Sequence, residues 1–198
     1  MKVENKYLID DFIVLFNYLW YRDFPLSKTH KTAGSPSEWT THVGICVRSC
    51  ADLMGYFTLF EHGNKTDAVI QNNAGEDVAH VEWEWSTILH VGSRKFNRNV
   101  NEIKKLYKQK EGAKFSAFIS YSRPEHLTNS LEIIQKQWKE SQHPLLVFLV
   151  TYGKRKGKNI RDLDKLGTYL IQNEKRKEIR TQPALPWEVK GARWEKNK

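Results

Sequence analysis

Two strand-like segments joined by a short polar turn constrain the fold of this chain more than any other feature. Residues 65–72 (KTDAVIQN) and 78–85 (VAHVEWEW) favour β-structure, and 73-NAGE-76 between them supplies a turn. Such a turn pairs residues whose numbers sum to 149. The strand-like segment 56–61 precedes them, so two successive hairpins are expected.

Helix and strand patterns alternate along the rest of the chain. Apolar residues at helical spacing predict an N-terminal helix over 7–21 and a second helix from near Glu38 to Gly55, capped by Ser37. Further helices are predicted over 99–109 and 127–138, and further strands over 115–122, 145–152 and 167–172. This order predicts an α/β domain, a central mixed β-sheet flanked by helices.

The 198 residues fit a single domain, because a chain of this length removes roughly 70% of its unfolded surface from water. The expected core covers residues 37–152. The helix over 7–21 packs on it, and residues 153–198 form a basic C-terminal extension whose end is a polar tail with Pro183 and Pro186.

The charge balance favours a polyanionic partner. Lys and Arg number 32 against 23 Asp and Glu, a net charge of +9. Nucleic acid is the first candidate, an anionic membrane the second, and a merely soluble basic protein is the alternative. Cys46 and Cys50 cannot build a disulfide framework, and no stretch approaches the ~20 apolar residues of a membrane span. We therefore expect a cytoplasmic protein without a membrane anchor.

Three carboxylates are expected on one face of the second hairpin. The pairing places Asp67 opposite Glu82 and Lys65 opposite Glu84. Since side chains alternate along a strand, Asp67, Glu82 and Glu84 emerge on the same side. The opposite side is the core, and it carries Ala68, Ile70, Val81, Trp83 and Trp85.

Carboxylates that converge in this way repel one another, and a hard divalent cation relieves the repulsion. Mg²⁺ is the natural occupant, with Mn²⁺ as a substitute. Such an ion neutralises charge on a phosphate and lowers the pKa of an attacking water, which suits phosphodiester hydrolysis. The alternative is an ordinary solvated strand face, in which Asp67 and Lys65 are cross-strand neighbours of the glutamates.

An Asp on the second strand, a turn, and Glu-x-Glu on the third strand resemble the PD-(D/E)XK nuclease superfamily, over residues 37–152. The resemblance implies a restriction-endonuclease-like fold in which Asp67 and Glu82 bind the metal. The third motif position, usually Lys, is Glu84, as in some restriction enzymes where a second carboxylate orients or activates water. Lys65 is a candidate for the missing positive charge, and Glu38 matches a helix Glu of the superfamily, although a first-turn carboxylate also favours the helix dipole.

Basic residues follow the carboxylates along the chain and are candidates for contacts with a nucleic-acid backbone. A solvated basic loop is the alternative for each of them. Trp187 and Trp194 are further candidates in the tail. The basic candidates are Arg94, Lys95 and Arg98 in a loop, Lys104 and Lys105 on the next helix, and Lys154, Arg155, Lys156 and Lys158 in a turn.

Other chemistries are less well supported. His42, Cys46 and Cys50 fall at i, i+4 and i+8 on the second helix, but three ligands on one helix span too far to close around one zinc ion. Buried, reduced cysteines are expected instead. The chain lacks GxxxxGK[ST], GxGxxG and GxSxG motifs, which argues against nucleotide-driven motors, dinucleotide enzymes and common serine hydrolases.

The sequence therefore predicts a metal-dependent endonuclease that hydrolyses DNA phosphodiester bonds, of a restriction, repair or phage type. RNA remains an alternative substrate, and a two-fold DNA site would require a homodimer. The competing predictions are a non-catalytic nucleic-acid-binding module on the same scaffold, and a protein whose basic surface meets an acidic partner.

Overall fold

The computed structural model describes residues 3–26, 35–62, 66–87, 94–139, 141–154, 161–193 and 195. The four α-helices of these residues are α1 (Val3–Arg22), α2 (Pro36–Leu53), α3 (Arg94–Gln109) and α4 (Leu127–Gln137). The seven strands are β1 (Phe57–His62), β2 (Thr66–Gln71), β3 (Asp77–Thr87), β4 (Phe115–Ser122), β5 (Leu145–Lys154), β6 (Arg161–Gln172) and β7 (Lys175–Pro183).

One mixed sheet holds all seven strands in the order of the sequence. Strands β1, β2 and β3 are antiparallel, β3, β4 and β5 are parallel, and β6 and β7 return antiparallel. Each parallel connection contains a helix, α3 before β4 and α4 before β5. The predicted α/β class with a central mixed sheet flanked by helices is confirmed.

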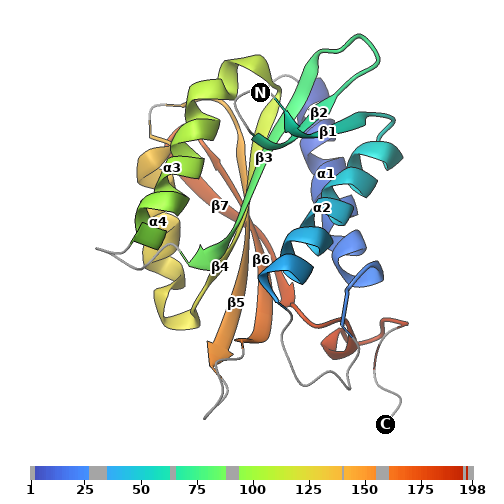
Figure 1. Ribbon diagram of the computed structural model, residues 1–198, viewed down its shortest axis with the longest axis vertical. Coiled ribbons are helices and arrows are strands. Elements are labelled where there is room, and N and C mark those ends of the chain that lie inside the picture. Colours follow the sequence, from blue (N-terminus) through green and yellow to red (C-terminus); the bar gives the residue numbers. More distant parts are fainter. Residues whose placement is uncertain are drawn as a thin grey trace.

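Helices cover both faces of the sheet, with α1 and α2 on one side and α3 and α4 on the other (Figure 1). Phe12 and Phe16 of α1 are fully buried against Phe148 of β5. On the other face Ile103 and Leu106 of α3 are buried in a second apolar cluster. No helix within the described parts of the chain is long and apolar enough to cross a membrane.

The β2–β3 hairpin has the predicted register. Ala68 pairs with Val81, Val69 with His80 and Ile70 with Ala79. The Asn72 side chain accepts hydrogen bonds from the backbone N–H groups of Ala74 and Glu76, at 2.9 Å each. Gly75 has a φ of 77°, a left-handed conformation that costs glycine little. The turn thereby fixes which side chains of β2 and β3 share a face.

Three sequence predictions were wrong in detail. The N-cap of α2 is Ser35 and not Ser37, because Pro36 occupies the first helical turn and Ser35 forms a reciprocal capping box with Glu38. The basic segment expected as a loop forms the first turns of α3, which begins at Arg94. The strand predicted over 167–172 is the longer strand β6, and a further strand, β7, forms where a polar tail was expected.

Removal of the Ser35 hydroxyl tests the observed cap. Ser35→Ala leaves one backbone N–H of α2 without its acceptor, so we expect the free energy of unfolding to fall by ~1 kcal/mol. Ser37→Ala is the matched control and should change it by less than ~0.5 kcal/mol. Urea denaturation of the three proteins measures both values. Equal losses in the two variants, or a larger loss for Ser37→Ala, would contradict the assigned cap.

Candidate active site

The β2–β3 hairpin brings Asp67 and Glu82 together on the sheet face that α3 covers. Their neighbours Ala68 and Val81 are paired and belong to the apolar cluster of the other face, so the alternation of side chains sends both carboxylates toward α3. The Asp67 Oδ2 atom accepts a hydrogen bond of 2.8 Å from the backbone N–H of Trp83. This bond fixes Asp67 against β3, beside Glu82.

Lys105 of α3 completes this arrangement. Its Nζ atom lies 2.7 Å from Glu82 Oε1 and 2.7 Å from Glu102 Oε2. The Glu82 side chain is 0% exposed and that of Lys105 is 24% exposed, so the ammonium group connects a buried carboxylate with the surface. We refer to Asp67, Glu82, Glu102 and Lys105 as the acidic site.

Lys105 lies in a different environment from the one expected from the sequence. It was expected to extend a nucleic-acid-binding surface, yet its ammonium group is bound to two carboxylates. Its positive charge therefore reaches Glu82 from helix α3 and not from a neighbouring strand. The i, i+3 spacing of Glu102 and Lys105 indicates that these two side chains pair on one side of the helix, but it does not show that the pair faces Glu82.

Burial shifts the titration of the acidic site. Desolvation, followed by the charge of Asp67, raises the pKa of Glu82 to about 10, although Lys105 acts in the opposite direction. Desolvation also raises the pKa of Asp67, against the hydrogen bond from Trp83. Desolvation lowers the pKa of Lys105, but its bonds to Glu102 and Glu82 outweigh that effect and raise it. Glu82 thus retains a proton near neutral pH beside a charged lysine.

Glu84 lies two residues further along the same strand face, as predicted, but its carboxylate is engaged locally. Its Oε1 atom accepts hydrogen bonds of 3.0 Å from both the backbone N–H and the hydroxyl of Ser86. Within the described residues, no group of three or more His, Cys, Asp or Glu side chains is arranged to hold a metal ion. The expected convergence of three carboxylates is therefore an adjacent pair, Asp67 and Glu82, with Glu84 bound separately.

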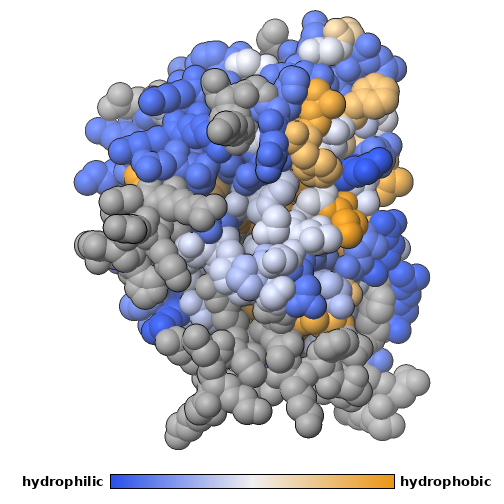
Figure 2. Space-filling model, viewed as in Figure 1, coloured by the Kyte–Doolittle hydropathy of each residue, from blue (hydrophilic) through white to orange (hydrophobic). Residues whose placement is uncertain are grey.

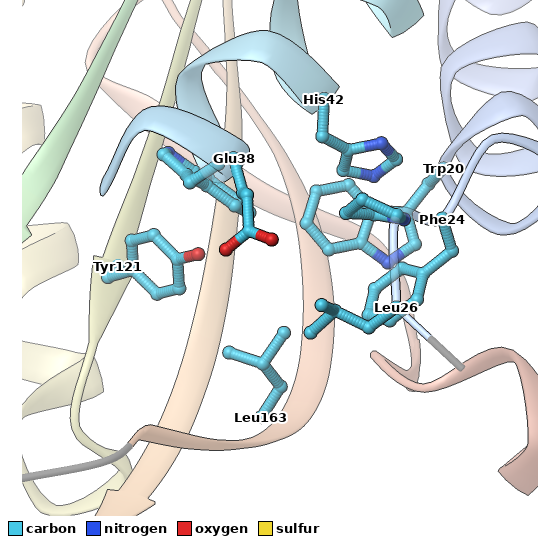
Figure 3. A pocket seen from close by; sticks show the side chains of 9 residues that line it. Trp20, Phe24, Leu26, Glu38, His42, Tyr121 and Leu163 are labelled. Carbon is cyan, nitrogen blue, oxygen red and sulfur yellow. The ribbon is translucent and has the colours of Figure 1, made fainter. Parts of the chain in front are cut away.

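Glu38 lies away from the acidic site. Helix α2 packs on the opposite face of the sheet, where Glu38 caps its own helix. Figure 3 shows its carboxylate at an aromatic pocket, beside Tyr121 and above Leu163. The sheet separates this pocket from Lys105, so the expected contribution of Glu38 to the carboxylate cluster is wrong. Its first-turn position serves the helix instead.

The basic candidates fall into three groups. Lys104 is exposed on α3, and the side of the molecule that carries α3 is strongly hydrophilic (Figure 2). Arg94, Lys95 and Arg98 belong to the first turns of α3, and Lys154 ends β5. Four candidates and one tryptophan lie outside the described residues: Lys65, Arg155, Lys156, Lys158 and Trp194. The Trp187 ring packs edge-on against Phe24, with the ring centroids 5.8 Å apart, so this tryptophan makes an aromatic contact within the protein.

The carboxyl ends of the parallel strands β3, β4 and β5 lie at the same end of the sheet. A basic residue lies at or after each of these strand ends: Arg94 begins the helix after β3, Arg123 follows β4, and Lys154 is the last residue of β5. Ligands of open α/β sheets bind beyond the carboxyl ends of the strands. Arg123 joins this group only in the structure, because the sequence does not show that three strand ends meet there.

The stripe of His42, Cys46 and Cys50 is buried in the apolar cluster beneath α2, and both cysteines are free. The Cys46 sulfur lies 3.8 Å from His42 Nδ1. Desolvation lowers the pKa of His42 to about 4 and raises that of Cys46. A neutral imidazole and protonated thiols fit the predicted core role and not metal ligation.

Comparisons with known proteins leave the family open. No family model and no curated protein matches the chain. Among solved structures, the YaeQ protein from Pseudomonas syringae aligns with a TM-score of 0.33 and 9% identity, over 78% of this chain and 80% of that chain. The YaeQ protein from Xanthomonas axonopodis pv. citri aligns with a TM-score of 0.35 and 8% identity, over 77% of this chain and 84% of that chain. Likenesses at this level assign neither a family nor an activity.

The raised pKa of Glu82 predicts a pH-dependent stability. Because this pKa lies above its unfolded value of 4.5, the native state holds a proton that the unfolded state has lost. The contribution of Glu82 is therefore full below pH 4.5 and declines as the pH rises toward about 10. We expect Glu82→Gln to remove a slope of at most ~1.4 kcal/mol per pH unit and to be the more stable protein at pH 8.

Urea denaturation between pH 5 and 9 checks this expectation. Glu111→Gln is the matched control, because that side chain is 87% exposed and should leave the slope of the wild type unchanged. A Glu82→Gln protein with the same pH slope as the wild type would show that Glu82 is already ionised beside Lys105.

Proposed function

We propose that this chain is a metal-dependent endonuclease that cuts DNA, with a restriction-endonuclease-like core and the acidic site as its active site. The observation that carries the proposal is the fully buried Glu82 beside the partly buried Asp67, with Lys105 2.7 Å from Glu82. Two carboxylates and a cation on one sheet face form a combination suited to phosphodiester hydrolysis.

The order of elements supports the proposed core. Helix α2 leads into the antiparallel strands β1, β2 and β3, and α3 then connects β3 to the parallel strand β4. This is the helix, three strands, helix, strand order of the PD-(D/E)XK resemblance, with Asp67 on its second strand and Glu82 on its third. The remaining strands extend the sheet beyond β4.

The donor set fits a hard divalent cation. Asp67 and Glu82 offer carboxylate oxygens, and no hydrogen bond from the described residues reaches the buried Oε2 of Glu82. We propose that these two residues hold Mg²⁺ or Mn²⁺. The ion would supply charge neutralisation at the phosphate and a water of lowered pKa.

Lys105 takes the role that the motif lysine has in the superfamily. Its ammonium group reaches the carboxylates from α3, and its raised pKa keeps it charged. A fixed positive charge at this position favours an anionic phosphate and the negative charge that develops during hydrolysis. Glu84, held by Ser86 next along the strand, remains the candidate that orients water.

Binding of DNA is proposed along α3 and the carboxyl ends of β3, β4 and β5. Lys104 on the exposed side of α3 and Arg123 after β4 are the described contributors. The net charge of +9 provides the electrostatic attraction, which should weaken steeply with salt.

A second function is favoured by the same ion pair. Lys105 already neutralises Glu82, so the acidic site is stable without an added ion, as expected for a non-catalytic nucleic-acid-binding module. That module would bind DNA with undiminished affinity in EDTA and after loss of Glu82.

Cleavage of plasmid and single-stranded phage DNA in Mg²⁺ or Mn²⁺ tests the proposal, because long substrates contain many sequences. We expect metal-dependent cutting by the wild type and losses of at least ~100-fold in Asp67→Asn and Glu82→Gln. Lys105→Met should also lose cutting, whereas its exposed neighbour Lys104→Met should cut normally and bind DNA more weakly in salt.

The pattern across these variants separates the two functions. Intact DNA under every condition, with salt-sensitive binding that the wild type shares with Asp67→Asn, Glu82→Gln and Lys105→Met, would contradict the nuclease and support the binding module. Equal effects of Lys104→Met and Lys105→Met on cutting would contradict a special role for the acidic site.

A further inference from the structure

The aromatic pocket beside Glu38 lies on the face of the sheet opposite the acidic site. It forms where the end of α1 and the first turns of α2 meet the carboxyl end of β4, the end at which open α/β sheets bind ligands. Its volume is about 260 Å³ including the open mouth, below the ~300 Å³ at which pockets for drug-sized ligands begin. The walls are mostly rings and apolar side chains: Trp20, Phe24, Trp39, His42, Tyr121 and Leu163.

The side chains of this pocket are buried at its floor and exposed at its rim. Trp20, Tyr121 and Trp39 are 0%, 1% and 4% exposed, whereas Pro25 and Glu38 are exposed. The rings hold one another, because the Trp39 ring centroid lies 5.1 Å from that of Trp20 and 4.1 Å from that of Tyr121. A ligand that enters at the rim would therefore meet rings already in place, which lowers the entropic cost of binding.

The charged side chain at this pocket is negative. Figure 3 shows the carboxylate of Glu38 directed into the space between Tyr121 and Leu163. Its Oε2 atom accepts a hydrogen bond of 2.5 Å from the backbone N–H of Ser35, which fixes the position of the carboxylate. The described residues that line the pocket include no Lys or Arg, although the chain has a net charge of +9. The pocket therefore favours a cation over an anion.

The imidazole in the wall does not oppose a cation. Desolvation lowers the pKa of His42 to about 4, so its ring is neutral near pH 7. This ring packs 4.6 Å from the Trp20 ring and 5.6 Å from that of Phe24. Arg22, near the end of α1, is bound to Asp23 at 2.7 Å, so its charge is compensated. A cation in the pocket would meet aromatic rings and a carboxylate.

We propose that this pocket binds the methylated ammonium head of a small organic cation. The negative quadrupole of an aromatic ring face attracts such a cation, and the attraction is strongest for tryptophan and in sites shielded from water. Trp20, Trp39, Phe24 and Tyr121 supply the rings, and Glu38 supplies a counter-charge at the mouth. This site lies apart from the acidic site and does not depend on the proposed nuclease.

The hydrogen-bonding groups of the pocket select this class of cation. A primary ammonium group needs several acceptors, and a hard divalent ion needs about six oxygen ligands. The described lining offers few oxygen acceptors, chiefly the Glu38 carboxylate. A fully methylated ammonium group has no N–H donors and presents carbon to the rings, so its burial leaves no donor unpaired.

Choline and its uncharged carbon isostere, dimethylbutanol, test the class of ligand. The two molecules have the same shape, but a carbon atom replaces the charged nitrogen in the alcohol. We expect the wild type to bind choline with a Kd of about 1 mM or below, and the alcohol at least ~10-fold more weakly. Chemical-shift titration of the Trp20 and Trp39 indole N–H groups measures both affinities at the pocket.

Two substitutions separate the charge from the rings. Glu38→Gln removes the charge but keeps a residue that can complete the capping box with Ser35, so it should weaken choline binding at least ~5-fold and leave that of dimethylbutanol unchanged. Phe24→Leu replaces a half-buried ring by an apolar chain and should weaken choline binding more than that of the alcohol. Glu111→Gln, at a side chain that is 87% exposed, is the matched control and should bind choline as the wild type does.

Three results would overturn the proposal: no shift of either indole signal up to about 10 mM choline, equal affinities for choline and dimethylbutanol, or undiminished choline binding by a folded Glu38→Gln protein. Thermal unfolding of each variant without ligand confirms that it is folded. Because these titrations contain neither DNA nor a divalent ion, their failure would leave the nuclease proposal standing, and a protein that binds choline without cutting DNA would leave this site standing.

Discussion

The ion pair between the buried Glu82 and Lys105 is the interaction on which the arrangement of the acidic site depends. A carboxylate with 0% exposure is costly to keep in a sheet unless a charge or a proton compensates it. Lys105 provides a compensating charge from α3, but desolvation and the charge of Asp67 still raise the pKa of Glu82 to about 10. A carboxyl group whose pKa is perturbed this strongly by burial and a neighbouring charge is typical of a functional site.

The scaffold explains why this arrangement persists. Strand β3 is paired on both sides, with β2 and with β4, so the direction of the Glu82 side chain is fixed by two registers. Helix α3 is anchored through Ile103 and Leu106, which are fully buried on either side of Lys105 in sequence. The apolar packing of the helix thus delivers the ammonium group to the carboxylate, and the site needs no loop to complete it.

Local patterns in the sequence predicted the hairpin and half of the site. The turn around Gly75 and the alternation in β2 and β3 were sufficient to place Asp67 beside Glu82. They could not place Lys105 beside Glu82, because this contact depends on how helix α3, which connects the parallel strands β3 and β4, packs on the sheet. Strand β7 was missed since its residues are polar on both sides of the strand, which removes the alternation that reveals a half-buried strand. Glu38 was misassigned because sequence alone does not show which face of the sheet its helix covers.

Mn²⁺ binding measured with proton release is the most direct test of the central claim, that Asp67 and Glu82 form a site for a divalent cation. Calorimetric titration in buffers of different ionisation enthalpy gives both quantities without any nucleic acid. We expect the wild type to bind Mn²⁺ and to release about one proton per ion near pH 7, and Glu82→Gln to do neither. Binding of the same strength to both proteins, or no binding to the wild type at millimolar Mn²⁺, would contradict it.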